Sequence, residues 1–324
     1  MKTPPAPLFR DPIFDGAADP TLIWNHQEKQ WWILYTCRRA NVPTNGVSFV
    51  HGSDIGICSS VDGQKWLYRG TVPNLNFEPG RNTFWAPEII EDNGLYHMFV
   101  SYVRGIPVDW DEPRHIVHYV GEDLWNLHFC DVLELSSDKV IDPCIYKVDD
   151  CWKMWYKDEV HQSHTYASIS RDLYHWEAHH PEITDCPHEG PNVFFYQGYA
   201  WMITDPWDGL GVYRSTDFAH WERMENILRE PGARQDDNRI GQHADIAVFG
   251  ENAYIFYHTH PGLANENRQN NSYDWNYAER QSGLQVAKLQ YQNGKLLCNR
   301  DEPFELFLIP PETRLASAQG KRGI

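Results

Sequence analysis

One pattern recurs five times along the 324-residue chain, and it limits the folds that the chain can adopt. A short apolar segment opens with a small acidic or His-bearing cluster, and a segment rich in Trp or Tyr follows it. The openings are residues 19–23, 86–90, 142–146, 189–193 and 243–247, and the followers are residues 31–35, 96–100, 152–156, 199–203 and 253–257. Self-similarity of this kind predicts an array of equivalent supersecondary units.

A second motif supports this interpretation. Ser-x-Asp, with a Trp four residues after the Asp, occurs at 60–66, 170–176 and 215–221, and a degenerate version lies at 121–125. An Asp in this place caps a turn, and the Trp packs between neighbouring units. Each unit has room for four short strands, so we expect an all-β, five-bladed β-propeller, with an irregular β-sandwich as the alternative. Residues 1–14 would form an N-terminal arm, and 15–324 a single catalytic propeller domain.

Composition excludes several classes of partner. The formal net charge of -17 argues against nucleic acid and against anionic membranes as partners. No run of 18 apolar residues is present, and residues 1–12 contain no apolar run. The seven cysteines are scattered and lack metal-binding spacing. We therefore expect a cytoplasmic protein, and the sequence leaves homo-oligomer formation open.

Three acids occupy matching places in the repeat. Asp19 and Asp142 each precede a Pro at the start of a unit, and Glu189 lies at the start of the fourth unit. Hydrolysis of a glycosidic bond needs a proton for the leaving oxygen and a base for the attacking water. Two carboxyl groups in different environments can supply both. A single Asp-Pro pair would more simply cap a turn, but an ordered set favours catalysis.

The segments around these acids, 18–20, 140–143 and 188–191, together with 84–89, resemble the motifs of glycoside hydrolase family 43. The resemblance implies an inverting, exo-acting glycosidase on a five-bladed propeller. Asp19 would be its general base, Asp142 would orient the acid and tune its pKa, and Glu189 would be the general acid. Glu88 would bind a sugar hydroxyl or hold the inner strand.

Other segments resemble family 117, the anhydro-galactosidases of agar breakdown. These are 31–39, 241–245 and 254–261, and His188 directly precedes Glu189. That resemblance implies a His proton donor, so His188 competes with Glu189 for this role, and an imidazolium has a suitable pKa. The alternative is a loop histidine bonded to its neighbours. Family resemblance allows arabinofuranosyl, xylosyl, galactosyl or anhydro-galactosyl units, from plant or algal oligosaccharides.

No cofactor is expected for the chemistry itself. In family 43 a His at the position of His243 commonly approaches a hydrated cation, usually calcium, so the resemblance implies a structural, calcium-like cation near His243. A single imidazole is an unusual calcium ligand, because calcium prefers oxygen. The alternative is a His that bonds a core carboxylate.

Further residues are candidates for the sugar pocket. Trp85, Trp110 and Trp207 could stack on sugar faces, and Lys157 and Arg234 could bind hydroxyl groups, although these charges could also be solvated. The loops 40–53, 104–115, 229–242 and 260–282 would shape the pocket. Two alternatives to a hydrolase stay open. One is a glycoside phosphorylase on the related propeller of family 130, which needs a cationic phosphate site, and the other is a sugar-binding propeller without catalysis.

Overall fold

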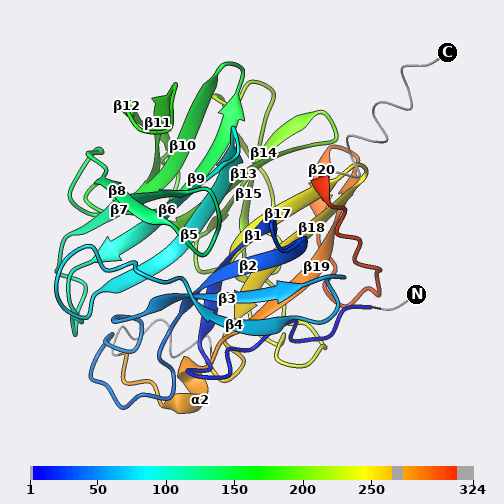
Figure 1. The fold of residues 1–324 in the computed structure, drawn as a ribbon. Helices are drawn as coiled ribbons and strands as arrows, with labels where there is room; N and C mark the ends of the chain where they lie inside the picture. The colour runs from blue at the N-terminus through cyan, green and yellow to red at the C-terminus, as the bar shows by residue number, and fades with distance from the viewer. Residues whose placement is uncertain (1–2, 265–272, 312–324) are drawn as a thin grey trace.

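The computed structural model describes residues 3–264 and 273–311 and consists of five four-stranded antiparallel sheets (Figure 1). Each sheet is built from four consecutive strands. The first holds β1 (Ala17–Asn25), β2 (Gln30–Cys37), β3 (Asp54–Ser60) and β4 (Leu67–Thr71); the second β5 (Thr83–Asp92), β6 (Leu95–Val103), β7 (Arg114–Gly121) and β8 (His128–Val132); the third β9 (Val140–Val148), β10 (Cys151–Asp158), β11 (His164–Ser170) and β12 (Glu177–Ile183); the fourth β13 (Glu189–Tyr196), β14 (Tyr199–Asp205), β15 (Gly211–Ser215) and β16 (Glu222–Arg223); the fifth β17 (Gln242–Phe249), β18 (Asn252–Thr259), β19 (Gly283–Gln292) and β20 (Lys295–Leu297). The predicted five-bladed propeller is confirmed, and the sandwich is excluded.

The first strand of every blade lies nearest the central axis. Strands β1, β5, β9, β13 and β17 contact one another in that order, and β17 contacts β1 to close the ring. In Figure 1 the colours pass round the ring until the orange strand β19 lies beside the first blade. The N-terminal segment helps to close the ring, since the Leu8 N–H donates to the Leu284 carbonyl at 2.8 Å. The five repeat openings therefore meet around one axis.

Aromatic side chains fill the spaces between blades. Trp32, Trp155 and Trp201 are completely buried, and separate apolar clusters join neighbouring sheets. The predicted Ser-x-Asp turns are present: Asp62 Oδ1 accepts the Gln64 N–H at 2.9 Å, and Trp66 Nε1 donates to the Gly63 carbonyl at 3.0 Å. One short helix, α2 (Tyr277–Arg280), lies in the part of loop 260–282 that the structure describes, whereas residues 265–272 of that loop lie outside the described residues. No helix in the described ranges is long and apolar enough to cross a membrane.

A β-bulge interrupts each innermost strand near its start. The register shifts there in all five blades, and one residue per blade has a left-handed backbone. These residues are Asp19 (φ 49°), Ala86 (φ 44°), Asp142 (φ 59°), Gly190 (φ 56°) and His243 (φ 33°). Such a conformation is unfavourable for residues other than Gly, and bulges of this kind re-aim side chains next to active sites. The bulge therefore sets the direction of the side chains at the start of each repeat.

A side chain at the bulge residue Gly190 would disturb the neighbouring His243 ring. A Cβ atom at this position would lie 3.0 Å from the His243 ring, and the φ of +56° disfavours any L side chain. We expect Gly190→Ala to lower the free energy of unfolding by about 1–3 kcal/mol and to displace His243. Gly198→Ala is the matched control, since its φ is +81° but nothing lies within 4 Å of the added Cβ. Equal losses of stability in the two variants, measured by urea unfolding, would refute the His243 contact.

Candidate active site

Asp19 lies at the axis among cationic partners. Arg38 Nη2 is 3.0 Å from Oδ1 and 3.1 Å from Oδ2 of Asp19. His243 Nδ1 lies 3.5 Å from Oδ1, and the backbone N–H of Asp19 donates to His258 Nδ1 at 3.3 Å. The carboxylate is buried but charge-balanced, which suits a group that must be ionised and ready to accept a proton.

Asp142 is the second buried acid. Its Oδ2 accepts the Gly190 N–H at 3.1 Å, and its own N–H donates to Ser101 Oγ at 2.9 Å. Burial raises the pKa of Asp142 to about 6; the charges of Glu189 and Asp19 add to this effect, and His243 and Lys157 oppose it. Asp142 therefore keeps its proton to a higher pH than an ordinary aspartic acid.

Glu189 is fixed by two donors. Lys157 Nζ lies 3.0 Å from Oε2, and Trp207 Nε1 donates to Oε1 at 3.1 Å. Burial favours the neutral carboxyl, but the Lys157 ammonium outweighs it, so the pKa of Glu189 is lowered. Lys157 is held in turn by Glu159 Oε1 at 3.0 Å. Two neighbouring carboxyl groups thus have pKa values displaced in opposite directions, as expected of acids with different catalytic roles.

The His188 side chain is hydrogen-bonded to groups other than these acids. Its side chain is fully buried; Nδ1 lies 2.8 Å from the Cys186 carbonyl, and Nε2 lies 2.6 Å from Thr165 Oγ1. Because a carbonyl only accepts, Nδ1 carries the proton and the Thr165 hydroxyl donates to Nε2. Burial lowers the pKa of His188 to about 4. Both ring nitrogens are committed to the protein, and the ring is neutral.

His243 is surrounded by carboxylates. Its backbone N–H donates to Asp205 Oδ2 at 3.2 Å. Burial disfavours a charged ring, but Asp19, Asp142 and Glu189 outweigh burial and raise the pKa of His243. These contacts suit an imidazolium. Among the described residues, His243 belongs to no group of three ligand atoms that could hold a metal ion, so they do not form the oxygen-rich cage that calcium prefers. The predicted cation near His243 stays a prediction, and no chemical step is assigned to it.

The three tryptophans predicted to bind sugar differ in their exposure to solvent. Trp207 is 41% exposed, lies over Lys157 and touches Glu189, whereas Trp85 is only 7% exposed and donates to the Val50 carbonyl at 2.6 Å. Trp110 is 37% exposed and packs edge-on against Tyr273. Trp207 therefore offers a ring face beside the acids, while Trp85 supports the wall.

Glu88 and Arg234 have different surroundings. Glu88 Oε1 accepts the Ile145 N–H at 2.9 Å and lines an axial cavity of about 350 Å³, together with Asp245 and Asn192. Burial, reinforced by the Asp245 charge, raises the pKa of Glu88 to about 8. Arg234 is not brought to the acids: it pairs with Asp237 at 2.7 Å and donates to the Val286 carbonyl at 2.9 Å.

Sequence reasoning missed four residues beside the acids. Arg38, Asp205 and His258 contact the bulge residues directly, and Glu159 holds Lys157. A usable signal exists, because the second strand of each blade runs antiparallel to the first and ends level with its start. Polar residues at the ends of the Trp- and Tyr-rich segments should therefore be counted as candidate site residues, together with the acids at the openings.

Comparisons with known proteins identify the fold. No family model matches the chain, and no curated protein matches it. Solved structures do match. A thermostable family-43 glycoside hydrolase aligns with a TM-score of 0.67 at 16% identity, covering 94% of this chain and 99% of that chain. The GH43_1 enzyme from Xanthomonas citri complexed with xylotriose gives a TM-score of 0.64 at 14% identity, covering 87% and 90%. A GH43 β-1,3-galactosidase with galactodeoxynojirimycin gives 0.64 at 14%, covering 89% and 96%.

Proposed function

We propose that the protein is an inverting, exo-acting glycoside hydrolase that releases a terminal sugar from an oligosaccharide. The observation that carries this proposal is the convergence of Asp19, Asp142 and Glu189 on His243, whose pKa all three raise. The pKa values of Asp142 and Glu189 are displaced in opposite directions, and the fold is shared with family-43 glycoside hydrolases. The xylotriose and galactodeoxynojirimycin complexes of structural neighbours support a pentose or galactose-type sugar.

In the proposed reaction, Asp19 accepts a proton from water while the water oxygen bonds to the anomeric carbon. The glycosidic C–O bond breaks with its electron pair on the leaving oxygen, and Glu189 gives that oxygen a proton. Asp142 orients Glu189 by accepting the N–H of the neighbouring Gly190, and the two carboxyl groups interact electrostatically. Trp207 packs against the sugar ring while its Nε1 holds Glu189.

Water is favoured over phosphate as the attacking group. Arg38 and Lys157 are each paired with a carboxylate of the site, Arg38 with Asp19 at 3.0 Å and Lys157 with Glu189 at 3.0 Å. A phosphorylase needs such cations to bind its phosphate. A screen of aryl glycosides and of plant and algal oligosaccharides, with and without phosphate and with product identification, tests the proposal. Phosphate-dependent turnover would replace hydrolysis with phosphorolysis, and binding without product would indicate a sugar-binding protein.

Lys157 is expected to affect the pH dependence of the proposed hydrolase through the pKa of Glu189. Glu189 must be protonated to act as an acid, so kcat/KM falls as pH rises through the pKa of Glu189. Lys157 lowers that pKa, and Lys157→Met should raise it and move the descending limb of the profile to higher pH. Lys147→Met, which removes a half-exposed lysine at the far end of β9, is the control and should leave the limb in place. An unmoved or acid-shifted limb in Lys157→Met would exclude Glu189 as the acid.

A further inference from the structure

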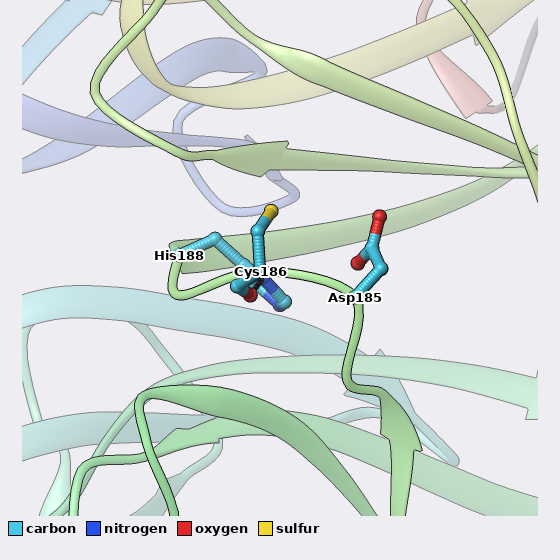
Figure 2. A group of neighbouring side chains, drawn as sticks. All are labelled: Asp185, Cys186 and His188. Atoms are coloured by element: carbon cyan, nitrogen blue, oxygen red, sulfur yellow. Dashed lines mark hydrogen bonds between the residues drawn. The ribbon is translucent and has the colours of Figure 1, made fainter.

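The segment that leads into Glu189 carries three different metal-ligating side chains. Asp185, Cys186 and His188 each place one ligand atom within 4.8 Å of the other two, and among the described residues this is the one group of its kind. Figure 2 shows the three side chains close together on the segment between β12 and β13. One carboxylate, one thiol and one imidazole are thus gathered within the four residues that precede the candidate acid Glu189.

The ligands are already held by neighbouring groups. Tyr213 Oη donates to Asp185 Oδ1 at 2.8 Å, and the Tyr213 side chain is buried. The His188 ring is fixed at both nitrogens, by the Cys186 carbonyl and by the buried Thr165 hydroxyl. Metal-binding histidines and carboxylates characteristically have such outer hydrogen bonds, which set their orientation. A metal would replace one bond to the imidazole, and the other would keep the ring in place.

We propose that Asp185, Cys186 and His188 form a binding site for a zinc-type divalent cation, with water as its fourth ligand. Mixed oxygen, sulfur and nitrogen ligands select zinc and exclude calcium and magnesium, which prefer oxygen alone. Zinc bonds of about 2.0–2.3 Å place tetrahedral ligands roughly 3.5 Å apart, so small side-chain rotations complete the site. Asp185 is exposed and Cys186 half-buried, which leaves a side open to solvent. On binding, the Cys186 thiol releases its proton and the sulfur bonds to the metal.

The probe is Co²⁺ added to the full chain after chelation and removal of the chelator, followed by competition with Zn²⁺. A thiolate-to-cobalt charge-transfer band that saturates at one ion per chain is expected, and Zn²⁺ should abolish it. Cys186→Ser should remove the band, and Asp185→Asn should weaken binding at least 10-fold while keeping the side-chain volume. Tyr213→Phe, which removes only the outer hydrogen bond, should weaken binding about 10–100-fold.

Cys130→Ser is the matched control, because Cys130 is exposed on β8 and belongs to no ligand group among the described residues. It should retain the band at full intensity. The proposal is overturned if wild-type protein shows no thiolate band, or if the band survives in Cys186→Ser. These readouts are spectroscopic, so they do not depend on whether the protein hydrolyses glycosides.

Discussion

Replacing Asp19 by Asn is expected to lower kcat by about 10²–10⁴-fold, because general-base catalysis contributes roughly that much. The amide keeps the size of the side chain but cannot take the proton from water. The variant should still fold, since Asn tolerates the left-handed backbone that Asp19 adopts at 49°. Steady-state kinetics on the substrate identified by the screen, together with the melting temperature, provide the measurement.

Asp150→Asn is the control for this change. Asp150 is exposed in the turn between β9 and β10, at the opposite end of the blade from the bulge. It should keep wild-type turnover. A folded Asp19→Asn variant with near-wild-type kcat would show that another group activates water.

Glu189→Ala should show a loss that depends on the leaving group. An oligosaccharide has a poor leaving oxygen that needs protonation, so its turnover should fall by about 10²–10⁴-fold. An aryl glycoside with an acidic phenol needs little protonation and should lose much less. Because Ala removes one of the two carboxylates that pair with the buried Lys157, Glu189→Gln is the second variant, and it should show the same dependence.

His188→Gln distinguishes the competing donor. Both ring nitrogens of His188 are bonded to the protein, so this change should leave the ratio of the rates on the two substrates as in the wild type. Leaving-group dependence in His188→Gln, and none at Glu189, would reverse the assignment.

The repeat made the architecture and the place of the chemistry predictable. Five equivalent openings require five blades, and equivalent starts of inner strands meet at one axis, so Asp19 and Asp142 could be placed together. The fourth blade departs from this equivalence. Its left-handed bulge residue is Gly190, so Glu189 reaches the axis from one position earlier.

The choice between His188 and Glu189 could not be made from the sequence for the same reason. Successive side chains of a strand point to opposite faces, but a bulge changes the phase at an unknown point. The ionisation states of the acids could not be predicted from the sequence either, because they depend on cations from other parts of the fold. Lys157 comes from β10 and Arg38 directly follows β2, and their distances to the acids follow only from the folded ring.

Trp85 and Arg234 show a related limit. Both belong to segments that shape the site end of the blades, yet Trp85 is buried behind Trp110 and His51, and Arg234 is tied to Asp237. Residue type and neighbourhood in sequence indicate a pocket, but burial decides which ring face is available to a sugar.

The stereochemistry of the reaction tests the central claim most directly. Asp19 and Glu189 come from strands that are not neighbours in the ring, with β17 and His243 between them. An inverting pair is separated by about 6.5–9.5 Å to admit water, whereas a retaining pair is about 5–5.5 Å apart. Proton NMR of the first-formed sugar, recorded before mutarotation, should show the anomeric configuration opposite to that of the substrate. A product with the substrate's own configuration would contradict both the inverting mechanism and the role of Asp19 as base.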